Sequence, residues 1–304
     1  MTTSVVMCTY NGEKYILEQL ESIYRQTGKP DEVIIQDDCS TDNTVQIIKN
    51  FIEEHNLSDS WALYINDDNL GWKKNFITAM SRASSDLIFL SDQDDIWNES
   101  KIEIMTDICD QKRDIELLVC RHEPVDADSG EKTYWYQPSF GNEDVTQVPF
   151  DGAFAETRRP GCTYALKKEL LQYVDEMWHE DWPHDQFFWC IAIARGTLYS
   201  YNKPLVKFRR HEDNNTPSNE KSRQNRAELA RNFADISGEL INNKERLGLT
   251  ADVVNTLTRS QTVNQKRAEY ISKRNVPGVI SLLTKLDCYT RFKAWLGDLV
   301  AVVR

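Results

Sequence analysis

The sequence predicts an α/β protein: a mostly parallel sheet with helices on both faces, followed by a separate helical segment. Three observations predict it. β-rich runs alternate with helical patterns over the first hundred residues, polar residues follow each of the first four β-rich runs, and the β signal nearly vanishes after Pro217. We therefore expect one domain over residues 1–217, divided near residue 115 into halves 1–115 and 116–217, and a helical domain over residues 218–304.

Strands and helices alternate regularly in the first half of the chain. The expected strands are β-branched or apolar runs, and the expected helices carry apolar side chains three or four positions apart. The strands are Ser4–Thr9, Glu32–Gln36, Trp61–Asn66 and Leu87–Leu90, and the helices are Gly12–Gln26, Ser40–His55, Trp72–Arg82 and Ile96–Arg113. In sheets of this kind, ligands bind at the carboxyl ends of the strands.

The second half of the chain is less regular. Residues 121–160 are rich in Asp, Pro and aromatic residues, and we expect loops with some mixed strands there. The expected elements that follow are a buried helix at Trp182–Arg195, strands at Thr197–Tyr201 and Leu205–Phe208, and three helices at Ser218–Arg246, Ala251–Arg274 and Pro277–Val303.

Composition and charge exclude several classes of protein. The chain is 40% hydrophobic and 28% charged, which suits a folded protein with a core, and its net charge of −12 argues against general nucleic-acid binding. The longest apolar run, Phe187–Ala194, is too short to span a membrane, and no charged-then-apolar leader opens the sequence. Seven cysteines, an odd number without metal-site spacing, suggest buried free thiols. We expect a cytoplasmic protein.

Charge is unevenly divided along the chain. Residues 218–304 contain 15 Lys+Arg and 9 Asp+Glu, a charge of +6, whereas residues 1–217 contain 21 and 39, a charge of −18. Such asymmetry between segments points to a partner that recognises one of them.

Polar residues follow each of the first four expected strands. Any one of these turns is ordinary loop chemistry, but four on one sheet edge indicate a binding site. The turns are Thr9–Gly12, Asp37–Asp42, Asp68–Gly71 and Ser91–Asp95.

The fourth turn is the most informative, because Asp92, Asp94 and Asp95 lie within four residues directly after an apolar strand. Carboxylates this close repel one another unless a cation, a hydrogen-bond donor or water intervenes. Oxygen ligands suit Mg²⁺ or Mn²⁺ bound between carboxylates and a substrate diphosphate. The alternative is a solvated acidic turn at the start of the following helix.

Taken in order, the runs CTYNGEKYI, IIQDDCSTDNT, DNLGWKKNF and FLSDQDDIW resemble the inverting family 2 glycosyltransferases, which have the GT-A fold. The resemblance covers roughly residues 1–217 and includes RPGCT at 159–163, HD at 184–185 and FRRHEDN at 208–214. The SDQDDIW and RRHEDN runs look most like bacterial rhamnosyltransferases of surface polysaccharide synthesis, whose products include O-antigen, capsule and cell-wall glycans.

The resemblance implies a role for each matching residue. Asp94 matches a metal-binding carboxylate, and His211 matches a histidine that completes the metal site or contacts the diphosphate. Asp185 matches the catalytic base. Residues that match the nucleotide-sugar pocket are Thr9, Tyr10, Asn11, Asp38, Asn69, Lys73 or Lys74, Asp92, Gln93, Arg209 and Arg210.

The assignment of Asp185 as the catalytic base depends mainly on the resemblance, because a carboxylate at a helix start is more often a cap. Glu180 and Asp181 lie nearby and are alternative bases. Gln186 stands where related rhamnosyltransferases often have Trp, which blurs the acceptor contacts.

The resemblance implies a single in-line displacement that inverts the anomeric carbon, with Mg²⁺ or Mn²⁺ as cofactor. Its expected donor is dTDP-rhamnose, and its expected acceptor is a lipid-linked oligosaccharide. The alternatives are a UDP-hexose or UDP-N-acetylhexosamine donor, or a non-catalytic glycan- or nucleotide-binding protein. A nucleotidyltransferase is disfavoured, because the turn after the first strand offers only Gly12 and Lys14 as a phosphate loop.

The last expected helix is amphipathic. Apolar residues recur along 277–304 at three- or four-residue steps, from Leu282 to Val303, and Lys285, Arg291 and Lys293 border them. This face either packs within the protein, forms a homodimer, or contacts the inner face of the cell membrane as a peripheral basic helix.

Overall fold

The computed structural model describes residues 1–127, 129–134, 136–211 and 222–303. They form two compact units. Unit 1 comprises Met1–Val148, Arg158–Phe188 and Thr197–Asp213, and unit 2 comprises Pro149–Thr157, Trp189–Gly196 and Asn214–Arg304. The boundary expected after Pro217 lies outside the described residues.

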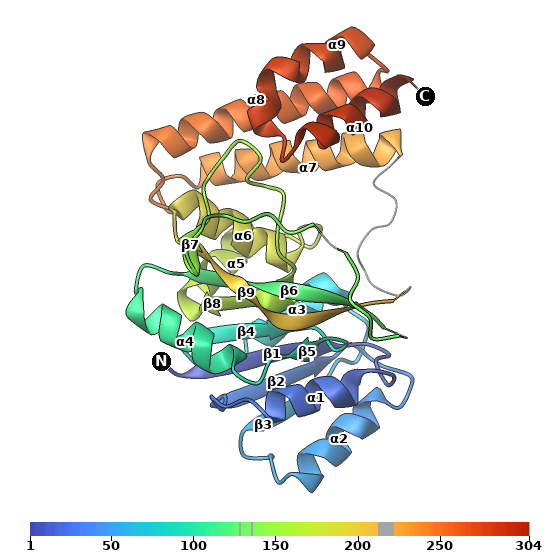
Figure 1. The fold of residues 1–304 in the computed structure, drawn as a ribbon, viewed down its shortest axis with the longest axis vertical. Helices are drawn as coiled ribbons and strands as arrows, with labels where there is room; N and C mark the ends of the chain where they lie inside the picture. The colour runs from blue at the N-terminus through green and yellow to red at the C-terminus, as the bar shows by residue number, and fades with distance from the viewer. Residues whose placement is uncertain (128, 135, 212–221, 304) are drawn as a thin grey trace. The chain divides into compact units, whose positions relative to one another are not determined.

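Unit 1 is built on a sheet that has nine strands among the described residues, in the order β3-β2-β1-β4-β8-β6-β9-β5, with β7 paired to β9 (Figure 1). The α/β class is therefore confirmed. β1 to β4 are parallel throughout, whereas β8, β5 and β7 each pair antiparallel to their neighbours, so the sheet is mixed beyond β4. The strands are β1 Thr3–Thr9, β2 Glu32–Asp37, β3 Trp61–Ile65, β4 Leu87–Ser91, β5 Ile96–Trp97, β6 Leu117–Asp126, β7 Val145–Gln147, β8 Tyr164–Lys167 and β9 Leu198–Arg210.

Helices cover both faces of the parallel half. Val5 and Met7 of β1 share a core with α1, α2 and α4, while α3 contacts β1 and β2. Because side chains alternate along a strand, Val6 points to the opposite face. The helical elements of this part of the chain are α1 Ile16–Tyr24, α2 Thr44–Glu54, α3 Trp72–Met80, α4 Lys101–Gln111, η1 Gly161–Thr163, η2 Lys168–Tyr173, α5 Val174–Met177 and α6 His184–Arg195.

Three expected elements of unit 1 need correction. The helix expected at Ile96–Arg113 begins at Lys101, because Ile96–Trp97 forms β5 and pairs with β9. The strands expected at Thr197–Tyr201 and Leu205–Phe208 are one strand, β9, which continues through Pro204 where its register with β6 shifts. An irregularity in pairing accommodates the missing N–H of proline.

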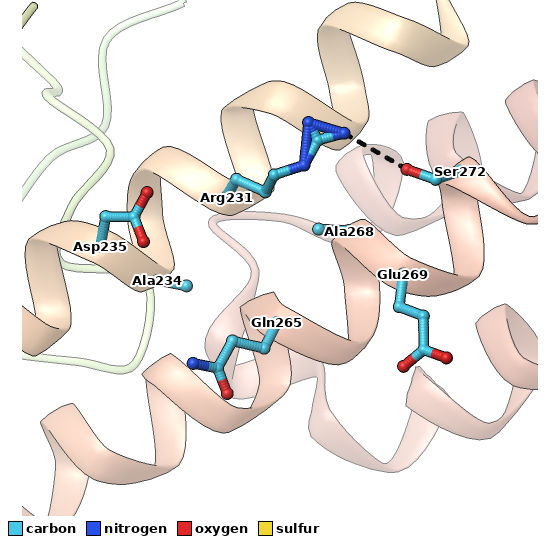
Figure 2. Close-up of a pocket in the computed structure, with 7 residues that line it drawn as sticks. All are labelled: Arg231, Ala234, Asp235, Gln265, Ala268, Glu269 and Ser272. Carbon is cyan, nitrogen blue, oxygen red and sulfur yellow. Dashed lines mark hydrogen bonds between the residues drawn. The ribbon is translucent and has the colours of Figure 1, made fainter.

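Unit 2 contains α7 Arg223–Asn242 and α8 Ala251–Ser272, which pack side by side. Ser222 and Thr250 cap them by accepting from the backbone N–H three residues on. A shallow groove of about 230 Å³ lies between the two helices, and the Arg231 guanidinium donates across it to Ser272 Oγ (Figure 2).

The third expected helix, Pro277–Val303, is wrong as a single helix. It is broken into α9 Val276–Ser281, η3 Leu282–Cys288 and α10 Phe292–Val303. Lys285 has a non-helical backbone within η3, and the extended backbone of Tyr289 separates η3 from α10. The break divides the expected apolar face. Leu282 and Tyr289 are buried in the core of unit 2, whereas Phe292 is exposed. Within the described part of the chain, none of the helices is both long enough and apolar enough to span a bilayer.

Candidate functional site

The polar turns meet because β1, β2 and β4 are parallel neighbours. Thr9 lies beside Asp37, and Met7 lies beside Ser91, so all three strands deliver their following residues to one edge of the sheet. Every residue that the resemblance assigns to the nucleotide-sugar pocket, the metal site or the catalytic base belongs to unit 1.

Asp38 holds the loop between β3 and α3. Its carboxylate accepts from Asn66 Nδ2 at 2.7 Å, from Leu70 N at 2.7 Å and from Gly71 N at 2.9 Å. Asn69 Nδ2 donates to the Asp38 carbonyl oxygen at 3.1 Å. Two residues expected in the nucleotide pocket, Asp38 and Asn69, therefore lie side by side and order this loop.

Thr9 has a different environment. Its hydroxyl is buried and donates to Asp37 Oδ2 at 2.7 Å, and the same carboxylate accepts from Ser40 N and Ser40 Oγ. The side chain of Thr9 thus links the end of β1 to the end of β2.

Gln93 fixes the turn after β1. Its amide accepts from Tyr10 N at 2.9 Å and donates to Tyr10 O at 3.0 Å. Gly12 leaves room for this amide, because a Cβ there would lie 2.2 Å from Gln93 Oε1. Asn11, at φ 47°, accepts from Thr41 N and joins the turns after β1 and β2.

Lys73 and Lys74 reach from the start of α3 to the segment before α6. Lys73 Nζ donates to Asp181 O at 2.8 Å, and Lys74 Nζ pairs with Glu180 Oε1 at 2.6 Å. Both contacts are exposed, so they are weak in water.

Asp94 and His211 come together although they are 117 positions apart. His211 Nε2 lies 2.7 Å from Asp94 Oδ2, and both side chains are about 15% exposed. The Tyr15 ring stacks on the His211 ring, with the two ring centroids 5.0 Å apart. The Arg209 guanidinium lies 5.2 Å from the centroid of the Tyr15 ring.

The two arginines before His211 point differently. Arg209 is buried and pairs with Glu18 of α1, and its backbone N donates to Asp95 Oδ1 at 3.2 Å. Arg210 is exposed, and its carbonyl accepts from Ala127 N. Arg209 therefore holds the acidic turn through its backbone contact with Asp95.

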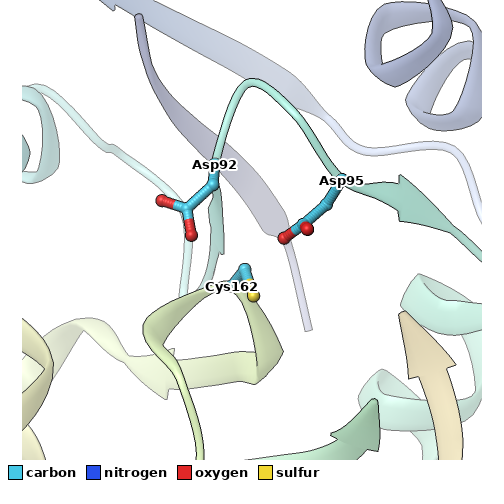
Figure 3. Close-up of side chains that lie close together, drawn as sticks. All are labelled: Asp92, Asp95 and Cys162. Atoms are coloured by element: carbon cyan, nitrogen blue, oxygen red, sulfur yellow. The ribbon is translucent and has the colours of Figure 1, made fainter. Parts of the chain in front are cut away.

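A second group, Asp92, Asp95 and Cys162, lies beside the acidic turn (Figure 3). Their ligand atoms are within 4.8 Å of one another. Burial and the charge of Asp94 raise the pKa of both Asp92 and Asp95. The buried Lys101 donates to the Cys162 carbonyl at 2.8 Å, and burial lowers its pKa to about 8.

Asp185 lies in the first turn of α6, and its negative charge contributes to the raised pKa of Asp92. Burial raises the pKa of Asp185 to about 6. Gly161 allows the approach of α6, because a Cβ there would lie 3.1 Å from His184 Nε2 and 3.3 Å from Asp185 Cβ. A carboxylate with this pKa suits proton abstraction near neutral pH.

The residues at the turn suit a divalent cation. Asp94 and His211 offer one oxygen and one nitrogen ligand atom, which lie 2.7 Å apart. Asp92 adds a carboxylate whose ionisation is unfavourable beside its acidic neighbours unless a cation is near. One or two protein carboxylates with substrate phosphates form the usual Mg²⁺ site, and carboxylate ligands suit Mn²⁺ equally.

Tyr15 and Lys101 escaped the sequence reasoning, which also gave no individual role to Gly161 or Cys162. The RPGCT run contains the latter two, and it marks the approach of η1 to α6. Nothing in the sequence indicates that Lys101 is buried near the site, because a lysine in a helix is normally exposed.

Comparison with known proteins gives a consistent family. A family model described as glycosyl transferase family 2 matches residues 4–165. The chain is 33% identical over 244 residues to dTDP-rhamnosyl transferase RfbG of Shigella flexneri, covering 74% of this chain and 79% of that protein. It is 34% identical over 121 residues to the poly(ribitol-phosphate) beta-N-acetylglucosaminyltransferase TarS of Staphylococcus aureus, covering 39% of this chain and 21% of that protein.

Two solved structures have the same fold. The crystal structure of S. aureus TarS 1–349 with UDP-GlcNAc matches at a TM-score of 0.65 and 20% identity, covering 99% of this chain and 89% of that chain. The mannosyltransferase PcManGT of Pyrobaculum calidifontis, in complex with GDP-Man and Mn²⁺, matches at a TM-score of 0.54 and 18% identity. The match covers 99% of this chain and 84% of that chain.

Proposed function

The chain belongs to glycosyl transferase family 2 and has the GT-A fold, and we propose that it transfers L-rhamnose from dTDP-rhamnose to a lipid-linked bacterial glycan. The observation that most supports this donor is the 33% identity to a dTDP-rhamnosyl transferase over 74% of the chain. We also propose a cytoplasmic location, where nucleotide sugars are made available to such enzymes.

The proposed reaction is one in-line displacement. An Asp185 oxygen accepts the proton of an acceptor hydroxyl while that oxygen bonds to the anomeric carbon and the bond from this carbon to the diphosphate breaks. The electron pair of that bond leaves with the nucleoside diphosphate, so the anomeric configuration inverts. The raised pKa of Asp185, about 6, supports this role.

The acidic turn is the proposed diphosphate site. Asp94 and His211 would hold Mg²⁺ or Mn²⁺, and the cation, when bound, would offset the charge on the departing diphosphate. The 2.7 Å contact between the two side chains supports their common role. Arg210, Lys73 and Lys74 are proposed as further cations near the donor.

A UDP-sugar is the competing donor, because the chain is also 34% identical over 121 residues to TarS, whose name specifies N-acetylglucosamine transfer. The two proposals differ in the base and sugar that the pocket selects. Nucleoside diphosphate release from dTDP-rhamnose, UDP-glucose and UDP-N-acetylglucosamine, measured with Mn²⁺, discriminates between them.

We expect dTDP-rhamnose to be turned over at least about tenfold faster than either UDP-sugar. Faster turnover of UDP-N-acetylglucosamine would contradict the rhamnosyl proposal and favour the UDP-sugar alternative. Calorimetric donor binding without turnover, with or without a lipid-linked acceptor, would instead favour a non-catalytic binding protein.

A further inference from the structure

We infer that α10 carries a docking surface for an anionic lipid bilayer. The surface, called the α10 stripe below, consists of Phe292, Leu296, Val300 and Val303. This inference rests on the proposed function only in that a lipid-linked acceptor would give membrane binding a use. Vesicle binding and sugar transfer are measured separately, so either can fail without the other.

Exposed apolar residues are concentrated in this part of unit 2. Of the fifteen large hydrophobic side chains that are exposed among the described residues, six lie between residues 280 and 303. Phe292 is 55% exposed and Val303 is 69% exposed. Large apolar groups gathered on a surface mark a contact with another apolar phase or partner.

The α10 stripe occupies one side of its helix. Its members are spaced by four, four and three residues, which places them on a common face. The opposite side is buried and includes Trp295, Asp298 and Val302. The helix is therefore amphipathic in the structure as well as in the sequence.

Strong contacts fix the outward direction of the stripe. Asp298 is fully buried and accepts from Arg226 Nη1 at 3.0 Å and from Arg267 Nε at 2.5 Å. Trp295 Nε1 donates to Val279 O at 3.0 Å. Because turning the helix would strip Asp298 of both arginines, the apolar face stays toward solvent.

Charge identifies the partner. Lys285 of η3 and Lys293 of α10 are exposed, Asp287 is paired with Arg259, and residues 218–304 carry +6. A symmetric contact between two copies would bring the same cations together. An anionic bilayer offers both an apolar phase for the stripe and phosphate groups for the lysines.

The test uses the intact protein and cosedimentation with sucrose-loaded vesicles, without donor or acceptor. One set of vesicles is phosphatidylcholine alone, and the other contains about one third phosphatidylglycerol. We expect sedimentation with the anionic vesicles, little with the neutral ones, and a loss of binding as salt is raised.

Two variants with matched controls locate the surface. Phe292→Ser/Leu296→Ser should weaken binding by about tenfold or more, whereas Leu17→Ser/Ile65→Ser, at similarly exposed positions of unit 1, should not. Lys285→Gln/Lys293→Gln should weaken binding and flatten its salt dependence, in contrast to Lys49→Gln/Lys207→Gln.

Three results would overturn the inference. They are no sedimentation of the wild-type protein, equal sedimentation of wild type and the stripe variant, and a dimer in light scattering that the stripe variant dissociates while no vesicles are bound. The last result would assign the α10 stripe to a contact between two copies of the chain.

Discussion

His211 Nε2 lies 2.7 Å from Asp94 Oδ2, at the point where the end of β9 meets the turn after β4. The two residues are far apart in sequence, and the fold brings one nitrogen and one oxygen donor into a single space beside Asp92 and Asp185. Such a pair is suited to share one cation.

Asp94→Ala should therefore abolish most metal-dependent turnover. Removal of a metal-binding carboxylate at the diphosphate site should lower kcat by a factor on the order of 100 or more. Turnover against Mn²⁺ concentration measures the effect, with the exposed Asp59→Ala as control. Turnover unchanged in Asp94→Ala would remove Asp94 from the proposed metal site.

Asp185→Asn should separate donor binding from transfer. The amide cannot accept the proton, so transfer should fall by a factor on the order of 100 to 10,000 while calorimetric donor affinity changes little. Asp181→Asn serves as control, and full transfer by Asp185→Asn would move the base to Asp181 or Glu180.

The same assignment predicts the acid side of the pH profile. Because burial raises the pKa of Asp185 to about 6, the wild-type rate should rise as pH increases through about 6 and then level off.

Local sequence patterns were sufficient for the parallel half of the sheet. β1, β2 and β4 each bury a continuous apolar run, and parallel pairing then requires their following turns to meet at one edge. The proximity of Asp38 to Asn69 follows from this geometry, because β2 pairs with β3.

Distant pairing accounts for what the sequence did not predict. Ile96–Trp97 forms a strand because β9, more than a hundred residues away, supplies its hydrogen bonds, and this overrides the local helical pattern. Cys162 and Lys101 meet across 61 positions, and nothing near either residue in sequence indicates the contact. The Tyr15–His211 stack likewise depends on tertiary structure.

Tyr15 should act as a positioning residue for His211. Its ring stacks on His211 and also contacts the Arg209 guanidinium, so removal of the ring should allow the imidazole to rotate away from Asp94. Tyr15→Leu should raise the Mn²⁺ concentration needed for half-maximal turnover by about 10-fold, and Tyr15→Phe should retain the wild-type value. Equal Mn²⁺ dependence in the two variants would contradict this role.

Gly12→Ala should disturb the turn after β1 through Gln93. The new Cβ would lie 2.2 Å from Gln93 Oε1, so the amide must leave the Tyr10 backbone. Donor affinity should fall several-fold, by about 1 kcal/mol, as it should in Gln93→Ala. Since both changes remove the same contact, the double variant should lose less than the sum; additive losses would show that Gly12 acts independently of Gln93.

Asp298→Asn should destabilise unit 2 far more than a change at an exposed ion pair. Asp298 is fully buried between Arg226 and Arg267, and the Arg267 guanidinium also lies 4.7 Å from the Tyr289 ring centroid. A neutral amide leaves two guanidinium groups near a buried site without their counter-charge, which should cost about 3 to 5 kcal/mol of the free energy of unfolding. Asp287→Asn is the matched control, because its pair with Arg259 is about half exposed and should contribute less than about 1 kcal/mol. Urea unfolding of both variants measures the difference, and equal midpoints would show that Asp298 does not anchor α10 to α7 and α8.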